Sequence, residues 1–196
     1  MRKDGRKLLG TVSVFFLILF LAGSVPGASA QDFSADLVNT VGKETTQSKL
    51  YVSGEKIRME MKEGIMIVRT DKRVSWMLMP SEKMYMENPI DMTRVPKTGK
   101  NFDGEIERIS LGSDSVDGQP TEKFKVTYTE NGKSMAAYQW IKDGQIPVKV
   151  EAVDGSYSME YKNISTGAQP AELFEVPADY EKMSMPSLGD MMPAIR

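Results

Sequence analysis

Apolar and polar residues alternate along most of the chain, and a period of two predicts β-strands. The clearest case is residues 56–62, in which Ile57, Met59 and Met61 fall on one face and charged residues fall on the other. Segment 74–79 is apolar on both faces, which predicts a central strand covered on both sides. Turn sequences separate roughly nine or ten such segments, each short enough to be one strand.

This spacing predicts a mainly β fold with little helix. We expect a strongly curved antiparallel sheet, or half-barrel, because an open sheet of this size tends to curl. Two segments hint at helix, residues 171–174 and 188–192. Residues 88–104 contain two prolines and the sequence Lys-Thr-Gly-Lys, and they predict a long connection. Such a connection is either a lid over a binding site or a plain linker across the end of the sheet.

The first 30 residues have the order of a secretory signal peptide. Four basic residues within positions 2–7 precede an apolar stretch at 8–22, and Ala28-Ser29-Ala30 is a cleavage site of the small-x-small type. We therefore expect a single domain over residues 31–182, followed by a loosely ordered, methionine-rich tail over 183–196. The protein is expected to be exported, to the periplasm in preference to the extracellular space, with no membrane span after cleavage.

The composition limits the classes of function. Cleavage would leave 21 basic and 26 acidic residues, a net charge of −5, which disfavours nucleic acid as a partner. The chain has no cysteine and no histidine, so it lacks disulfides, the commonest general base and a thiol nucleophile. It also contains no nucleophile elbow, phosphate loop or dinucleotide fingerprint. We expect a protein that is not an enzyme and uses no cofactor.

Methionine is concentrated in four Met-x-Met triplets, three of them between residues 59 and 86. Residues i and i+2 of a strand point to the same side, so each triplet places two thioethers together on one face. Methionine adapts to varied apolar partners, and its sulfur is also a soft ligand for Cu(I). The triplets are Met59-Glu60-Met61, Met77-Leu78-Met79, Met84-Tyr85-Met86 and Met183-Ser184-Met185.

Six short motifs carry a family resemblance: Phe33-Ser-Ala-Asp-Leu, Lys56-Ile-Arg-Met-Glu-Met, Ile67-Val-Arg-Thr-Asp-Lys, Trp76-Met-Leu-Met-Pro, Lys83-Met-Tyr-Met-Glu and the C-terminal 173–180. Together they resemble uncharacterised exported bacterial proteins related in fold to the outer-membrane lipoprotein carrier LolA, the LolA-like superfamily. The resemblance covers most of residues 32–182, and its motifs are structural rather than catalytic. It implies a curved antiparallel half-barrel around an apolar cavity, in which LolA-like carriers bind the acyl chains of lipoproteins.

The residues and the resemblance together predict a non-enzymatic binding or carrier protein. Its ligand would be an apolar or lipid-like small molecule, including a lipoprotein acyl chain, held on the concave face of the sheet. Packed cores prefer leucine, isoleucine and valine, so a methionine-rich region suits a cavity for flexible chains, although the same residues can also fill a solid core. The candidate lining residues are Ile57, Met59, Met61, Ile67, Arg69, Trp76, Met77, Leu78, Met79, Met84, Met86, Tyr138 and Trp140.

The sequence is also compatible with two other functions. The first is Cu(I) or Ag(I) binding through the Met-x-Met motifs. Met183 and Met185 are the candidate ligands, because the other triplets share strand faces with apolar residues of core type. The second is a structural or interaction module without a ligand, using a sheet edge or the connection at 88–104.

Arg58 and Arg69 lie on predicted strands. Arg58 is expected to face solvent, since it lies opposite the face that carries Ile57. Arg69 shares a face with Ile67. It is expected to pair with Asp71 or another acid, and contact with a lipid head group is the alternative.

Overall fold

The computed structural model of this 196-residue chain describes residues 32–92, 101–102, 104–130 and 132–183. Three predictions fall wholly or partly outside this part of the chain. They are the signal peptide at 1–30, much of the connection at 88–104, and the tail after Met183, with Met185 and the expected helix at 188–192.

The described residues form one sheet of twelve strands and one short 3₁₀ helix, in agreement with the predicted mainly β class. The strand number is higher than the nine or ten expected, and the last strand has only two residues. The elements are β1 (Phe33–Val41), β2 (Glu44–Ser53), β3 (Lys56–Met61), β4 (Gly64–Arg69), β5 (Val74–Met79), β6 (Met84–Pro89), β7 (Glu105–Val116), β8 (Gln119–Glu130), β9 (Lys133–Lys142), β10 (Ile146–Ala152), β11 (Tyr157–Thr166), η2 (Ala171–Phe174) and β12 (Glu181–Lys182).

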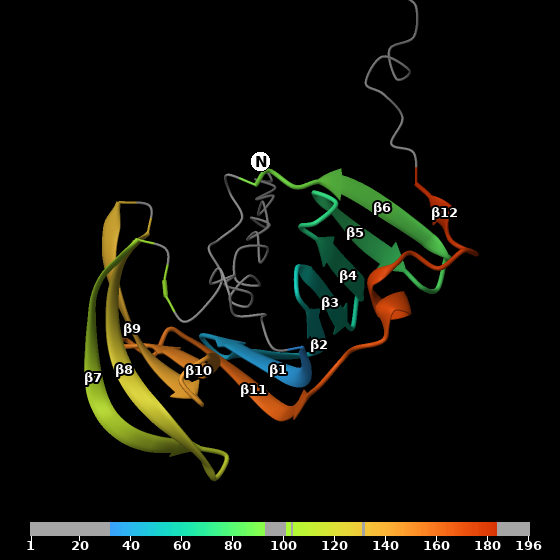
Figure 1. Ribbon diagram of the computed structural model, residues 1–196. Helices are drawn as coiled ribbons and strands as arrows, with labels where there is room; N and C mark the ends of the chain where they lie inside the picture. The colour runs from blue at the N-terminus through green and yellow to red at the C-terminus, as the bar shows by residue number, and fades with distance from the viewer. Residues whose placement is uncertain (1–31, 93–100, 103, 131, 184–196) are drawn as a thin grey trace, which may run out of the picture.

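The sheet is strongly curved and does not close. Strands adjacent in sequence pair antiparallel in two meanders, β1–β6 and β7–β11, and the pairing of β1 with β11 joins the meanders. β12 is parallel to β6, and β7 ends the sheet on the other side. The arms formed by β3–β6 and β7–β9 face each other across a concave side (Figure 1). The predicted curved antiparallel half-barrel is therefore confirmed.

Several strands are longer than predicted, because backbone pairing continues beyond the apolar alternation. β2 begins at Glu44, before the apolar alternation of residues 49–53, and its first four residues are exposed. β7 and β8 extend to a two-residue turn, Asp117-Gly118, in which both residues have positive φ, 49° and 74°. This turn conformation matches the twist of the flanking strands and suits Asp and Gly.

The main hydrophobic core lies on the concave side, where side chains from β1–β4 meet side chains from β8–β11. Leu50 of β2 and Val126 of β8 are both almost completely buried in it. Phe102, from the predicted connection at 88–104, is also buried there, with its ring centroid 4.8 Å from that of Tyr128. This part of the connection therefore contributes to the core rather than acting only as a linker.

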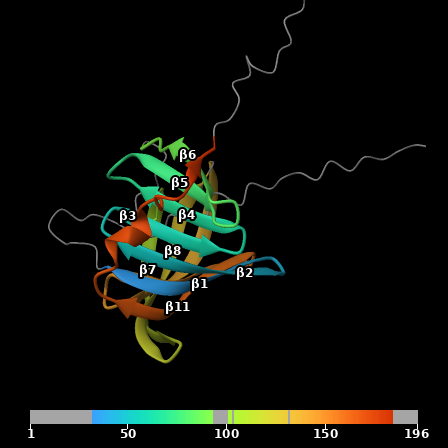
Figure 2. The same ribbon diagram turned by 90° about the vertical axis from the view of Figure 1, so that its right-hand side faces the viewer.

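A second core cluster lies on the outer face of the same sheet. After β11 the chain returns across β3, β4 and β5, as Figure 2 shows, and pairs with the edge of β6. We call residues 170–183 the C-terminal strap. Phe174 of the strap is fully buried against Ile67, Trp76 and Leu78. The strap therefore covers apolar side chains that would otherwise face solvent on the outer face.

β7 is an edge strand that carries exposed apolar side chains. Ile106, Ile109 and Leu111 are 64%, 44% and 48% exposed. The pairing of β7 with β8 shifts register twice, once near Glu107 and once near Gly112. Bulges of this kind bend an edge strand and make its pairing with another strand less favourable.

Candidate functional site

Methionines of β3–β6 lie together on the concave face of the sheet. The register pairs Met59 with Met66, Met66 with Met77, and Met77 with Met86, which places four methionines in one row across four strands. Direct cross-strand partners project from the same face, with Cβ atoms about 4.5–5.5 Å apart. Other methionines follow two residues away on the same strands and share the face. We call this set the methionine face: Met59, Met61, Met66, Met77, Met79, Met84 and Met86.

The methionine face is partly accessible, whereas the neighbouring part of the concave side is packed. Met59 is 2% exposed and belongs to the core, but the other six members are half-buried. On β1 and β2 the same face carries Phe33, Leu37 and Leu50, and each of these is at most 3% exposed. The methionines therefore lie where the concave side changes from packed core to accessible apolar surface.

The structure divides the thirteen predicted lining residues between the two faces of the sheet. Seven lie on the concave face: Ile57, Met59, Met61, Met77, Met79, Met84 and Met86. Six lie on the outer face: Ile67, Arg69, Trp76, Leu78, Tyr138 and Trp140. The reason is that chain neighbours in a strand point in opposite directions, so a ligand on the concave face would not reach the second group.

Met66 belongs to the concave group, although it was not among the predicted lining residues. It lies between Ile65 and Ile67, which both belong to the outer cluster. The cross-strand pairing of Met66 with Met59 and Met77 places it at the centre of the row. Alternation within residues 65–70 places Met66 on the face opposite Ile65 and Ile67. Only the strand register brings Met66 beside the other methionines.

The outer-face residues of β4 and β5 have structural contacts. Ile67, Trp76 and Leu78 pack on Phe174 of the strap. The indole Nε1 of Trp76 donates a hydrogen bond of 2.9 Å to Glu87. These side chains therefore form a closed core beneath the strap.

Tyr138 and Trp140 lie on the outer face of the other arm. The Nζ of Lys123 lies 4.8 Å from the Tyr138 ring centroid and 4.5 Å from that of Trp140, and the Nζ of Lys149 lies 4.8 Å from the Trp140 ring. Trp140 is buried, and its Nε1 donates a 2.8 Å hydrogen bond to Asp114. Cation–π contacts and the indole hydrogen bond account for the positions of both rings.

Arg69 is 4% exposed, and it links the turn after β4 to the strap. Its Nε and NH2 groups donate to the two carboxylate oxygens of Asp71 at 2.8 and 2.7 Å. Its NH1 group donates to the carbonyl oxygen of Phe174 at 3.1 Å and to the carboxylate of Glu175. The prediction that Arg69 pairs with Asp71 or another acid is confirmed.

The prediction that Arg58 faces solvent is wrong. The Arg58 side chain is 12% exposed, because the strap lies over it. Its NH1 group donates to the carbonyl oxygen of Leu173 at 3.0 Å, and its Nε donates to Glu60 at 2.8 Å. The alternation placed Arg58 on the correct face, but it could not show that a segment more than 100 residues away covers that face.

The ion pairs around Arg69 predict that acid weakens the fold. Hydrogen bonds from Arg69 lower the pKa of Asp71. Burial acts to raise the pKa of Glu175, but hydrogen bonds from Lys72 and Arg69 outweigh it, and that pKa is also lowered. A carboxyl whose pKa is lowered by folding stabilises the folded state above its unfolded pKa of about 4, and this contribution disappears as the pH falls through the folded pKa.

We therefore expect the urea midpoint to fall steadily below about pH 5. In Asp71→Asn the midpoint should be lower at pH 7 and should fall less steeply with acid, because one of the titrating pairs is gone. Urea denaturation followed between pH 7 and pH 3 measures both quantities. Parallel curves for the two proteins would contradict a contribution from Asp71.

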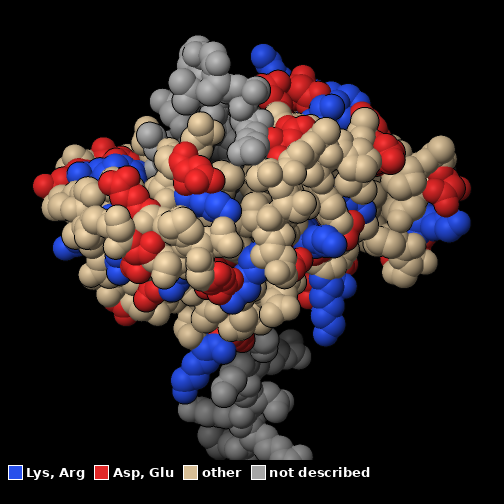
Figure 3. Space-filling view, turned by 60° about the horizontal axis from the view of Figure 1, so that its bottom comes forward, with Lys and Arg blue, Asp and Glu red and all other residues tan. Residues whose placement is uncertain are grey.

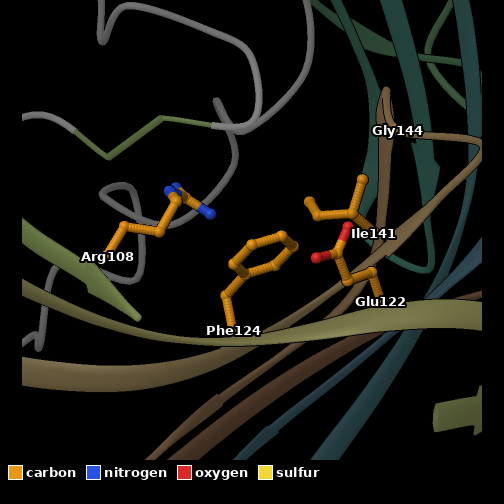
Figure 4. A pocket seen from close by; sticks show the side chains of 5 residues that line it. All are labelled: Arg108, Glu122, Phe124, Ile141 and Gly144. Carbon is orange, nitrogen blue, oxygen red and sulfur yellow. The ribbon is translucent and has the colours of Figure 1, made fainter. Parts of the chain in front are cut away.

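A small pocket lies on the concave side of the arm formed by β7–β9. Its volume is about 140 Å3, and Figure 4 shows its lining residues, Arg108, Glu122, Phe124, Ile141 and Gly144. The guanidinium carbon of Arg108 lies 5.2 Å from the Phe124 ring centroid. Phe124 also packs against the main core, so the apolar part of this pocket lies on the same concave side as the methionine face.

A polar network borders this pocket. Arg108 donates to both carboxylate oxygens of Glu105, each at 2.9 Å, and to the side-chain oxygen of Gln139 at 2.7 Å. Gln139 is fully buried. The concave side of this arm therefore combines apolar side chains with the ion pair of Arg108 and Glu105.

A second, shallower hollow of about 400 Å3 lies at the ends of the β3–β4 and β5–β6 hairpins. Met61 and Gly64 border it, together with the turn residues Lys62, Glu63 and Pro80. The methionine face therefore opens to solvent at this end.

The described residues contain no group of three or more carboxylates arranged to hold a metal ion. Within the same residues, no helix has the length and apolar character needed to cross a membrane. Acidic and basic side chains are interspersed over the face shown in Figure 3.

The curved open sheet with a partly accessible apolar concave face defines a half-barrel class of fold. The chain belongs to a family described as a domain of unknown function, DUF4412, whose model matches residues 34–145. No curated protein matches the chain in sequence. The predicted relation to an uncharacterised family is confirmed by this match, and the predicted curved half-barrel is confirmed by the sheet itself.

Solved structures resemble the chain at low sequence identity. A chain in the MucA/MucB complex of Pseudomonas aeruginosa is 14% identical to this chain. The match covers 77% of this chain and 57% of that one, with a TM-score of 0.49. LprF from Mycobacterium bovis is 12% identical, with 78% and 91% covered and a TM-score of 0.44. A domain from Vibrio parahaemolyticus, described as an outer membrane lipoprotein-sorting protein, is 11% identical, with 73% and 89% covered and a TM-score of 0.32. These matches concern the fold alone, and the chain spans less than two thirds of the MucB chain.

Proposed function

We propose that this protein is a non-enzymatic binding or carrier protein, and that its methionine face holds the apolar part of a lipid-like ligand. The observation that carries the proposal is the row Met59, Met66, Met77 and Met86, of which the last three are half-buried on a concave face. Unbranched thioether side chains change shape at little cost, so they can fit flexible acyl chains.

The two faces of the same strands support this assignment. On the packed outer face, β4 and β5 carry Ile67, Trp76 and Leu78, which are side chains of well-defined shape. On the concave face, the adjacent positions Met66 and Met77 are methionines. A regional bias in composition would enrich methionine on both faces, so the segregation favours a role for the concave one.

The opposite arm adds a second apolar wall. Phe124 and Ile141 line the small pocket on the concave side of β8 and β9, and Phe124 also packs against the main core. A chain held between the two arms would contact both walls, and each methylene group removed from water contributes about 0.8 kcal/mol. Arg108 borders the same pocket, so a polar end of the ligand would meet a charged and hydrogen-bonding group there.

The signal-peptide pattern of residues 1–30 supports action outside the cytoplasm, in the periplasm in preference to the extracellular space. Free fatty acids, phospholipids and lipoproteins share the acyl chain as their apolar part. We propose that the protein binds this shared acyl chain. Separate titrations with a fatty acid and an acylated peptide distinguish these sources.

The test is titration of the purified protein with a fluorescent fatty acid. We expect saturable binding, and we expect Met66→Gln combined with Met77→Gln to weaken it at least about tenfold, because two polar amides would replace the centre of the apolar row. Ile65→Gln is the matched control, since Ile65 is also half-buried but lies on the outer face. That control should bind like the unaltered protein.

Thermal unfolding followed by circular dichroism separates loss of binding from loss of fold. The proposal would be overturned by the absence of binding to the unaltered, fully folded protein. Equal weakening by the concave and outer variants at equal stability would also contradict it.

A further inference from the structure

Four methionines at the β5–β6 end of the methionine face form two directly opposed pairs. Met77 is the cross-strand partner of Met86, and Met79 is the cross-strand partner of Met84. Cβ atoms of direct partners lie about 4.5–5.5 Å apart, and residues i and i+2 of one strand lie about 6.5–7 Å apart. Two adjacent strands therefore present four thioethers around one small rectangle, which we call the thioether quartet.

The surroundings leave the quartet accessible to a small ion. All four methionines are half-buried. The neighbouring position on β4 is Gly64, where an added Cβ would lie 3.7 Å from the Sδ of Met77. The Met77 sulfur thus lies beside a residue without a side chain. Met66 adjoins Met77 on the next strand and provides a fifth thioether near the quartet.

The chemistry of these ligands selects a class of ion. Thioether sulfur is soft and uncharged, and it favours Cu(I) and the chemically similar Ag(I) over hard or borderline divalent ions. The chain has no cysteine and no histidine, so methionine sulfur is its main soft side-chain ligand. Three or four converging thioethers match the low coordination numbers of a soft monovalent cation.

We propose that Met77, Met79, Met84 and Met86 form a binding site for a soft monovalent cation, Cu(I) or Ag(I). This site goes beyond the proposed lipid function and does not depend on it, although both use the concave face. It also differs from the alternative site considered from the sequence, which used Met183 and Met185. The backbone N–H of Met183 donates to the Tyr85 carbonyl oxygen at 2.8 Å, so the start of the tail lies along the edge of β6.

The test is titration of the full chain with Ag(I), which needs no reductant, and with Cu(I) under anaerobic reducing conditions against a chromophoric chelator. We expect one strong site per chain for each ion and none for Zn(II). Shifts in the 13C-methyl NMR signals of the methionines provide a direct readout, and the largest shifts should come from the quartet.

The decisive variant is Met79→Leu combined with Met84→Leu, which removes two sulfurs at nearly constant volume and polarity. Affinity for Ag(I) should fall at least tenfold, with the melting temperature nearly unchanged. Met59→Leu is the matched control, because Met59 lies on the same face but is buried in the core, and this variant should keep the affinity.

Three results would overturn the site: no stoichiometric Ag(I) binding by the unaltered chain, unchanged affinity in the double variant, or loss of binding only with Met183→Leu and Met185→Leu. Fatty-acid binding by the unaltered chain is measured separately and decides none of these three results. Metal binding without lipid binding would therefore contradict the lipid function alone, and the reverse result would contradict the thioether site alone.

Discussion

Replacing Phe174 by alanine is expected to lower the free energy of unfolding by about 3–5 kcal/mol, the usual cost of deleting a fully buried aromatic ring. Phe174 is completely buried, and it fills the outer cluster over Ile67, Trp76 and Leu78. Its loss would leave a cavity beneath the strap. Urea denaturation measures the change, and the slope of the transition shows whether the sheet and strap still unfold as one unit.

Tryptophan fluorescence reports the same event locally. Trp76 lies under the strap, whereas Trp140 lies in a separate cluster on the other arm. In a Trp140→Phe background, Phe174→Ala should shift the emission of Trp76 to the red, because water gains access to the indole. Leu173→Ala is the control, since Leu173 is only half-buried in the same helix and should cost clearly less. An equal loss of stability in both variants would contradict a special role for Phe174.

Replacing Arg69 by methionine is expected to destabilise the protein by about 2–3 kcal/mol, because the buried guanidinium donates charge-assisted hydrogen bonds that no other group replaces. Asp71, Glu175 and the carbonyl oxygen of Phe174 would each lose a hydrogen bond from the guanidinium. Methionine keeps much of the apolar stem, so the loss reports mainly on the charge and its hydrogen bonds.

The acid dependence provides an internal check on this second result. The pKa values of Asp71 and Glu175 are lowered in the folded protein, so protonation below about pH 4 should remove much of the difference between Arg69→Met and the unaltered protein. Arg58→Met is the matched control. Arg58 also donates to a strap carbonyl, but it is more exposed and should cost less. A difference for Arg69→Met that stays constant down to pH 3 would contradict the assignment to these ion pairs.

The strands and their faces were predictable because alternation is a local property of the chain. The segment 56–62 showed which side chains of β3 point together, and the structure confirms Ile57 and Met59 as buried on one side. The limits of β5 agreed with the prediction, whereas β2 begins before its apolar alternation, since its exposed polar end has none. Phe102 gave no signal, because a single aromatic residue in a polar connection has no periodicity.

The candidate site was only half predictable, because each strand has two faces and the sequence does not show which one faces the concavity. Trp76 and Met77 are adjacent in the chain and lie on opposite sides of the sheet. The predicted lining residues therefore included side chains of both the outer core and the concave surface. Met66 was missed for the same reason, since its position depends on pairing with Met59 and not on its own neighbours.

The sequence by itself determined the mainly β class, the curved antiparallel sheet, most strand positions and the methionine triplets, because a period of two is contained within six or seven consecutive residues. Only the tertiary structure decided that the row of methionines lies on the concave face and that the strap closes the outer face. Those features depend on the register between strands and on contacts between residues such as Arg69 and Glu175, which are 106 positions apart. Local alternation contains no information about such distant partners, so the same triplets that indicate a strand cannot show which surface they form.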